Sequence, residues 1–193
     1  MQKLNQKLAE AAKTAFPAAA LVFGEGLSKK PLLAVIGEAP GAEEEKLRRP
    51  FVGKAGKNLD SFLETLGLAR ADVYITNLVK LHPTQLSKAN RVINRPPTKQ
   101  EVAFFAPYLM AELQAVAPQY VATLGNFSLR AMLGDEKATI GAAHGQLSVL
   151  ASGMKLFPLY HPASIIYNQS LKSVYAADLA ILKNVLDAAK NAL

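Results

Sequence analysis

Four short apolar runs in this sequence are each followed by residues that could carry chemistry. Gly37-Glu38-Ala39-Pro40-Gly41 follows the first run, Thr76-Asn77 the second, Gly125-Asn126 the third and His161-Pro162-Ala163-Ser164 the fourth. Glycine lets backbone N–H groups approach a ligand closely, and an asparagine amide can read the edge of a base through its paired donor and acceptor. Together these stretches would supply a carboxylate, an amide, open backbone and an imidazole. Each also has a structural alternative, as a turn, a capping amide or a structural histidine.

A second stretch combines one aromatic ring with several cations. Pro50-Phe51-Val52-Gly53 lies among Lys46, Arg48, Arg49, Lys54 and Lys57. A ring in that setting can stack a base while its neighbours hold phosphates, although the local pattern suits a core phenylalanine equally well. The preceding run Glu43-Glu44-Glu45 is typical of a solvated face or a helix N-terminus.

The apolar runs predict buried strands, because each is short, continuous and followed by a polar or glycine-bearing turn. They are Leu32–Ile36, Val73–Ile75, Tyr120–Leu124 and Leu156–Tyr160. Periodicity and capping patterns predict helices over 56–66, 98–116, 126–133 and 170–193, and a long loop over 80–99. This alternation favours a single domain over 1–193, an α/β/α fold with a mainly parallel four-stranded sheet. The four polar stretches should then converge at the carboxyl ends of the strands.

The composition limits the possible functions. The chain has 193 residues, a net charge of +7 and no cysteine. A disulfide, a Cys-based zinc site, an iron–sulfur cluster and a thiol nucleophile are therefore excluded, and the three histidines are too dispersed to indicate a metal site. The apolar runs are too short to cross a bilayer and the polar N-terminus is unlike a signal sequence, so we expect a cytoplasmic protein. The positive charge makes nucleic acid a candidate partner.

Taken in order, the motifs resemble those of the family 4 uracil-DNA glycosylases. The resemblance is carried by Gly37-Glu38-Ala39-Pro40-Gly41, Arg49-Pro50-Phe51-Val52-Gly53-Lys54-Ala55-Gly56, Thr76-Asn77-Leu78-Val79-Lys80, Leu124-Gly125 and His161-Pro162-Ala163. It implies hydrolysis of the N-glycosidic bond between uracil and deoxyribose, which leaves an abasic site in the DNA. It also implies single- or double-stranded DNA as the partner, and we expect a monomer without a cofactor.

The resemblance implies roles for individual residues. Phe51 would stack on a uracil that is flipped out of the duplex. Asn77 would pair with the O4 and N3 edge of that uracil and reject cytosine. His161 would donate a hydrogen bond to O2 as the departing base gains negative charge.

The group that positions the attacking water is less defined. In the best-known branch of the superfamily an aspartate stands in the place of Ala39, and a tyrosine that bars thymine stands in the place of Gly41. This chain has neither. We expect Glu38 to orient or polarise the water, or to hold the base, with Glu44 as the second candidate. Gly37, Ala39 and Gly41 would contact the base.

DNA contacts are expected from basic residues near these motifs and from the loop after His161. The residues that we expect to bind DNA are Arg49, Lys54, Lys80, Arg91, Arg95, Ser164 and Ile165. Ile165 or Ile166 would act as a wedge near the minor groove. Tyr167 stands where the family usually has an arginine, which would weaken the grip on DNA.

The chain also departs from the family at its metal cluster. Family 4 members usually hold a four-cysteine iron–sulfur cluster, whereas two ligand places align here with Leu81 and Phe105. The other two fall near Ala9 to Ala19, and we expect apolar packing to replace the cluster. The segment 80–99 resembles the insertion of a crosslinking branch whose nucleophilic histidine aligns with Asn94. An amide cannot act as that nucleophile, so crosslinking is not expected.

Two other functions remain open. The missing cluster and Tyr167 motivate a non-catalytic DNA-binding module of the same fold, which would bind DNA in a salt-dependent way without forming product. Gly41 leaves room beside C5 of the base, which would suit a glycosylase for another deaminated base.

Overall fold

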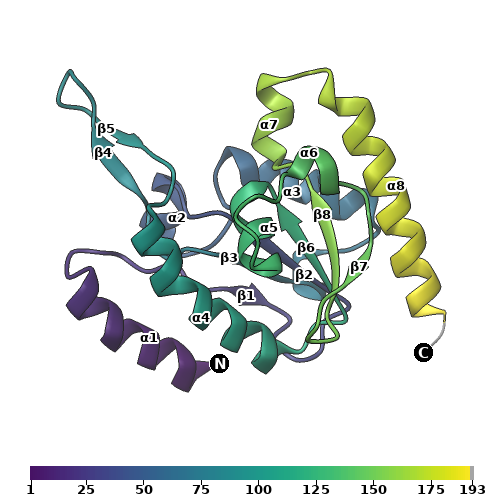
Figure 1. Cartoon of the computed structure of the whole chain (residues 1–193), viewed down its shortest axis with the longest axis horizontal. Helices are drawn as coiled ribbons and strands as arrows, with labels where there is room; N and C mark the ends of the chain where they lie inside the picture. Colours follow the sequence, from purple (N-terminus) through teal and green to yellow (C-terminus); the bar gives the residue numbers. More distant parts are fainter. Residues whose placement is uncertain (192–193) are drawn as a thin grey trace.

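A six-stranded sheet lies at the centre of the fold, with helices on both faces (Figure 1). The computed structural model describes residues 1–191, apart from the side chains of residues 166 and 167. The main sheet contains β1 (Glu25–Gly26), β2 (Leu33–Gly37), β3 (Tyr74–Asn77), β6 (Tyr120–Leu124), β7 (Ser148–Val149) and β8 (Lys155–Leu159), and a separate hairpin contains β4 (Thr84–Leu86) and β5 (Val92–Asn94). The helices are α1 (Gln2–Ala15), α2 (Ala42–Leu47), α3 (Lys54–Thr65), the 3-10 helix η1 (Arg70–Asp72), α4 (Lys99–Val116), α5 (Asn126–Leu133), α6 (Ile140–Ala143), α7 (Pro162–Tyr167) and α8 (Leu171–Lys190).

The four apolar runs form the parallel centre of the sheet. The strand order is β1-β3-β2-β6-β8-β7, and the pairs β3-β2, β2-β6 and β6-β8 are parallel. The prediction of an α/β fold is confirmed, whereas the predicted count of four strands is wrong. β1 and β7 each add an antiparallel strand at one edge. Both span only two residues, which is too short to show a pattern in the sequence.

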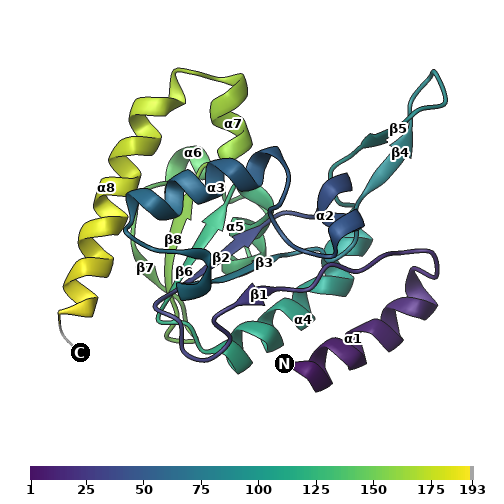
Figure 2. The ribbon, with the colours of Figure 1, turned by 180° about the vertical axis from the view of Figure 1, so that it is seen from behind.

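Both faces of the central strands are covered. Leu33 and Val35 of β2 belong to the apolar cluster that includes α3 and α8, while Ala34 and Ile36 belong to the cluster that includes α1, α4 and α5. In Figure 2 helix α3 crosses in front of the sheet, and α4 and α5 lie behind it. Burial on both faces explains why these strands are continuous apolar runs rather than alternating ones.

The longer helices follow the sequence closely. α5 has the predicted bounds, and α4 begins with the predicted capping box. Thr98 Oγ1 accepts from the Glu101 N–H at 3.1 Å, and Glu101 Oε2 accepts from the Thr98 N–H at 2.7 Å. α3 begins at Lys54 rather than Gly56, and residues 192 and 193 of the last predicted helix lie outside the described residues. Within residues 1–191, no helix is both long and apolar enough to span a membrane.

The predicted loop over 80–99 is wrong in its middle part, which forms an antiparallel hairpin. Its strands pair through Thr84↔Asn94, Gln85↔Ile93 and Leu86↔Val92. The hairpin projects from the rest of the molecule in both ribbon views (Figures 1 and 2). Each strand has three residues of mixed polarity, so neither has a strand signal of its own.

Two positions that align with expected cluster ligands belong to the apolar core. Leu81 is 6% exposed and Phe105 is fully buried, in the cluster that joins α1 and α4 to the sheet. The Phe105 ring stacks on Phe16, with ring centroids 5.6 Å apart. Leu8 of α1 is buried in the same cluster. Apolar packing therefore joins the N-terminal segment to α4 at this place.

Truncating Phe105 should test this packing. We expect Phe105→Ala to lower the free energy of unfolding by about 3–5 kcal/mol, because the variant loses a buried ring and leaves a cavity. Phe104→Ala is the matched control, since its ring is only partly buried and its loss should be smaller. Urea unfolding followed by circular dichroism measures both. Equal losses in the two variants would contradict a specific role for Phe105.

Candidate active site

The loops after β2, β3 and β8 meet at one cavity of about 530 Å³, at the carboxyl edge of the parallel strands. The start of α3 and the base of the β4–β5 hairpin complete its wall. The lining residues are Glu38, Ala39, Pro40, Gly41, Glu44, Phe51, Gly53, Lys54, Ala55, Asn77, His82, Pro83, Asn94, Arg95, His161, Ala163 and Ser164. Three residues expected to bind DNA are among them, namely Lys54, Arg95 and Ser164.

The side chains of Phe51 and Asn77 approach each other at Gly37, the last residue of β2. A Cβ atom at Gly37 would collide with Asn77 Oδ1 and with the Phe51 ring, so glycine permits this close approach. Phe51 is 4% exposed and Asn77 is 3% exposed. The Phe51 ring packs against the core cluster and also lines the cavity. Both interpretations of this ring, core residue and cavity wall, therefore describe part of its environment.

Arg70 supports the loop that presents Phe51. Phe51 has a φ angle of 52°, which is unusual for a residue with a side chain. The Arg70 guanidinium donates to the carbonyl oxygens of Phe51 and, at 3.3 Å, of Pro50. Its Nε also donates to Asp60 of α3 at 2.6 Å. Strained backbone persists where surrounding contacts enforce it, and no sequence motif included Arg70.

The two candidate water-positioning acids have different surroundings. Glu44 accepts a hydrogen bond from the Gly41 N–H at 3.1 Å. It also accepts from the N–H groups of Val52 and Gly53 at 2.9 and 2.7 Å, so it ties the loop after β2 to the loop before α3. No described residue donates a hydrogen bond to the Glu38 carboxylate, and burial raises the pKa of Glu38 above its usual value. The geometry thus favours Glu38 over Glu44 as the acid that can act on water.

His161 lines the cavity with a neutral imidazole ring. It is the N-cap of α7, and its Nδ1 accepts a hydrogen bond from the Ala163 N–H at 3.1 Å. Burial lowers the pKa of His161 from 6.5 to about 4, so the ring is neutral near pH 7. A neutral imidazole whose Nδ1 accepts a hydrogen bond carries its proton on Nε2. The ring centroid lies 6.3 Å from that of Phe51, with the two planes inclined by 25°.

Lys80 is buried, so the prediction that it binds DNA is wrong. Its Nζ lies 2.5 Å from Glu112 Oε2 and donates to the backbone carbonyl of Asn77 at 2.7 Å. Glu112 Oε1 accepts from the hydroxyl groups of Tyr74 and Thr76 at 2.7 and 2.9 Å. Burial lowers the pKa of Lys80, while Glu112 acts in the opposite direction. This buried ion pair supports the backbone that carries the amide of Asn77.

Two arginines that were expected to bind DNA are engaged in ion pairs. Arg49 contacts both carboxylate oxygens of Glu25, at 2.8 and 3.1 Å. Arg95 contacts both oxygens of Glu101, each at 2.7 Å. Bidentate pairs of this kind hold the guanidinium in place, so either side chain would have to leave its partner to grip a phosphate fully.

The remaining predicted DNA-binding residues lie on either side of the cavity. Arg91 is exposed in the turn of the hairpin. Ile165 of α7 is partly buried against the core cluster and is not part of the cavity lining, and its role as a wedge stays a prediction. The side chains of Ile166 and Tyr167 lie outside the described residues.

His82 is part of the cavity wall, although the sequence indicated no partner for it. Its Nδ1 lies 2.9 Å from Glu45 Oε2, and its Nε2 lies 2.8 Å from Asn94 Oδ1. These contacts connect α2 to the base of the hairpin. The three residues are separated in the chain, so no local motif could reveal their contact.

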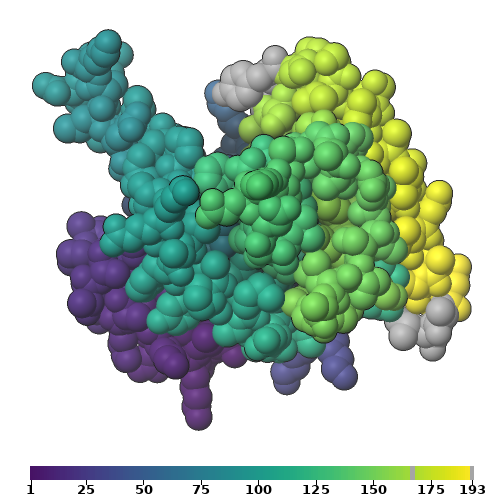
Figure 3. Space-filling model, viewed as in Figure 1, coloured from purple at the N-terminus to yellow at the C-terminus, as the bar shows by residue number. Residues whose placement is uncertain are grey.

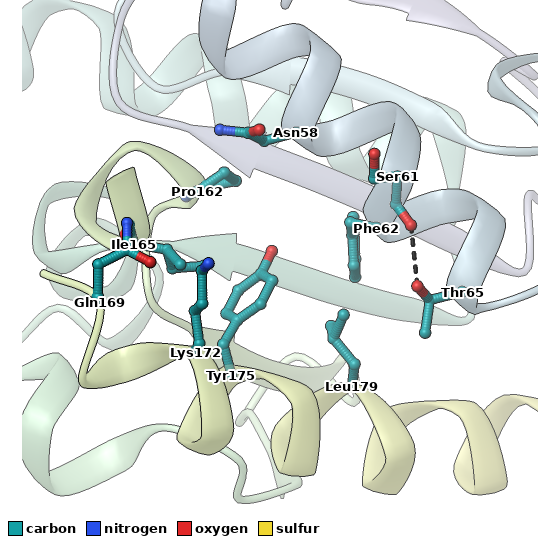
Figure 4. Close-up of a pocket in the computed structure, with 10 residues that line it drawn as sticks. All are labelled: Asn58, Ser61, Phe62, Thr65, Pro162, Ile165, Gln169, Lys172, Tyr175 and Leu179. Carbon is teal, nitrogen blue, oxygen red and sulfur yellow. Dashed lines mark hydrogen bonds between the residues drawn. The ribbon is translucent and has the colours of Figure 1, made fainter. Parts of the chain in front are cut away.

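A second hollow of about 380 Å³ lies between α3, α7 and α8 (Figure 4). It is lined by apolar side chains such as Phe62 and Leu179 and by polar ones such as Asn58, but by no acid or histidine. The groups that could act on a base are therefore in the first cavity. In the part of the chain that the structure describes, no cluster of three or more His, Asp or Glu residues could hold a metal ion.

The fold and the cavity define an α/β protein with a ligand site at the carboxyl edge of its parallel strands. The chain belongs to the uracil DNA glycosylase superfamily, whose family model matches residues 23–183. It is 37% identical over 172 residues to the type-4 uracil-DNA glycosylase of Saccharolobus solfataricus, which covers 86% of this chain and 76% of that protein. It is 33% identical over 168 residues to the type-4 uracil-DNA glycosylase of Thermotoga maritima, covering 86% and 83%. The crystal structure of Pedobacter heparinus SMUG2 shares the fold, with a TM-score of 0.56 and 14% sequence identity over 84% of this chain and 77% of that one.

Replacing Lys80 should reveal its structural role. We expect Lys80→Met to lower the free energy of unfolding by about 3–5 kcal/mol, because the Glu112 carboxylate is left buried without its cation. The double variant Lys80→Met/Glu112→Gln should recover part of this loss, because the unpaired charge is removed. Urea unfolding measures both variants. A Lys80→Met variant as stable as the wild type would contradict a stabilising role for this ion pair.

Proposed function

We propose that this chain is a uracil-DNA glycosylase of the family 4 type, a DNA-repair enzyme that hydrolyses the N-glycosidic bond of uracil and leaves an abasic site. Relatives named as type-4 uracil-DNA glycosylases are 33% and 37% identical to it over most of both chains. The observation that carries the assignment of the site is the position of Glu38, Phe51, Asn77 and His161 around one cavity.

Phe51 and Asn77 recognise the base in this proposal. The damaged nucleotide is flipped out of the duplex, which costs a few kcal/mol. Stacking of the base on the Phe51 ring stabilises the flipped state by about 1–3 kcal/mol, which offsets part of this cost. The Asn77 amide accepts a hydrogen bond from N3–H of uracil and donates one to O4. Cytosine has an acceptor at N3 and a donor at C4, so its pattern is reversed and the amide rejects it.

His161 and Glu38 act on the bond itself. As the C1′–N1 bond breaks, its electron pair moves onto the uracil, and negative charge develops at O2. The Nε2–H of the neutral His161 donates a hydrogen bond to that oxygen, and one such donor is typically worth about 10²–10³ in rate. The Glu38 carboxylate orients a water molecule toward C1′ and takes its proton. Gly37, Ala39 and Gly41 border the base on the side of the loop after β2.

The remaining expectations belong to the same proposal. Lys54 and Ser164 at the cavity wall contact the DNA backbone. Both apolar clusters are built on one sheet, which supports a single domain over 1–193. We expect it to act as a monomer.

Uracil release from a labelled oligonucleotide tests the assignment. We expect His161→Ala to lower the single-turnover rate by about 10²–10³-fold, through loss of the donor to O2. Asn77→Ala should reduce the preference for uracil over cytosine by about 1–3 kcal/mol, through loss of the paired hydrogen bonds. His144→Ala is a matched control, because His144 is also partly buried but pairs with Asp178 outside the cavity. Unchanged release in both cavity variants would discard these assignments.

A substrate panel separates the alternatives for the same site. Gly41 lines the cavity without a side chain, which leaves space at one edge of the base. Faster release of hypoxanthine or mispaired thymine than of uracil would identify a glycosylase for another base. Salt-dependent DNA binding without any released base would identify a non-catalytic module.

Glu38 should determine the acidic limb of the pH profile. Burial raises the pKa of Glu38 above 4.5, and the carboxylate must be ionised to orient water, so activity should fall as the pH drops through that raised value. Burial lowers the pKa of His161 to about 4, so His161 becomes protonated at a lower pH than Glu38. We expect Glu38→Gln to lower the rate by about 10²–10⁴-fold and to remove the limb. Glu43→Gln, at an exposed neighbouring position, should keep the wild-type rate and the acidic limb. If the acidic limb persists in Glu38→Gln, the ionisation belongs to another group.

A further inference from the structure

The β4–β5 hairpin exposes apolar side chains next to the cavity. Leu86 is 66% exposed and Val92 is 68% exposed, and the two residues are paired across the strands of the hairpin. In the space-filling view the hairpin stands apart from the surface formed by the C-terminal helices (Figure 3). Exposed apolar residues that gather on one element mark an interaction surface more often than residues that are scattered singly.

The pairing register places this apolar pair on the face of the hairpin that borders the cavity. Leu86 lies opposite Val92, and Thr84 lies opposite Asn94, two residues closer to the base of the hairpin on each strand. Residues two positions apart on a strand share a face. Asn94 lines the cavity, so Leu86 and Val92 continue the same face outward from the cavity mouth. The apolar pair lies about 7 Å along the strands from Thr84 and Asn94, a distance equal to about two base steps of duplex DNA.

The hairpin is anchored at its base. His82 contacts Glu45 on one side and Asn94 on the other, at 2.9 and 2.8 Å. Arg95 donates to the Thr84 carbonyl at 3.0 Å and pairs with Glu101. These contacts fix the direction in which the hairpin leaves the cavity wall.

The tip of the hairpin carries free positive charge. The Ser87 N–H donates to the Arg91 carbonyl at 2.8 Å, and the Arg91 N–H donates to Ser87 Oγ at 3.1 Å, which closes the turn. Lys88 and Arg91 are exposed, and within the described residues neither side chain forms an ion pair. The hairpin therefore presents an apolar face with cations at its tip, which matches a polymer that offers both apolar ring surfaces and phosphates.

We propose that the hairpin binds duplex DNA beside the extruded nucleotide, with Leu86 and Val92 packed against the base step that the flipped base leaves and with Lys88 and Arg91 on phosphates. Apolar side chains inserted between base steps stabilise the unstacked geometry, and the major groove is wide enough to admit a two-stranded ribbon. This inference rests on the proposed function.

Binding to a labelled duplex that contains one tetrahydrofuran abasic-site analogue tests the proposal without chemistry. We expect Leu86→Ser/Val92→Ser to bind this duplex about tenfold more weakly, because the apolar contact is lost. The same variant should bind the corresponding single strand within about twofold of the wild type, because a single strand has no duplex stack to wedge. Thermal unfolding should be unchanged, because both side chains are exposed.

Val149→Ser is the matched control for exposure. Val149 is 67% exposed, and it pairs with Lys155 at the start of β8, at the opposite end of the sheet from the cavity. We expect it to bind the duplex like the wild type. Lys88→Ala/Arg91→Ala should lower the slope of log Kd against log salt by about 2, whereas Lys29→Ala/Lys30→Ala, before β2, should leave it unchanged.

Wild-type affinity in Leu86→Ser/Val92→Ser would overturn the proposal and leave the apolar face to a protein partner. An equal loss in Val149→Ser would overturn it as well. A wild-type protein that binds the duplex but never releases uracil would refute the proposed activity. The role of the hairpin would still be tested, because the duplex affinity of Leu86→Ser/Val92→Ser can be compared with that of the wild type without any uracil release.

Discussion

The close approach of Phe51 and Asn77 at Gly37 is the constraint on which the cavity depends. Parallel pairing of β2 with β3 places Gly37 beside Asn77, and the missing side chain at Gly37 leaves room for a ring and an amide. Hydrogen bonds then fix the loop after β2 and the loop before α3. Glu44 accepts hydrogen bonds from three backbone N–H groups, and Arg70 donates one to the Phe51 carbonyl. A base that enters the cavity therefore meets groups already in position, and little ordering cost is added to the cost of flipping.

Much of the positive charge near this cavity supports the structure. Lys80 pairs with Glu112 in the core, and Arg49 and Arg95 form bidentate pairs with carboxylates. A charge removed from water needs such a partner, because its desolvation is otherwise uncompensated. The 22 lysines and arginines of the chain are therefore not all available to phosphates near the site. Free cations remain at the hairpin tip and at the start of α3.

The cavity lies between elements of different rigidity. On one side α7 begins at His161 and packs against α3 and α8 through Ile165. On the other side the hairpin is anchored at its base and has few contacts at its tip, which is where local opening is easiest. In the proposed complex, the groups that act on the base lie at the rigid edge of the sheet, and the projecting hairpin makes an adaptable contact with DNA.

The sequence by itself determined the α/β architecture and four residues of the candidate site. Strands buried on both faces appear as continuous apolar runs, and Glu38, Asn77 and His161 follow such runs within two residues, so parallel pairing alone predicts that they meet. The edge strands, the hairpin and the role of Lys80 were decided only in three dimensions. A lysine has the same local sequence whether it faces a phosphate or a carboxylate 32 residues away. That choice depends on which distant segments pack together, and burial then makes the partner obligatory.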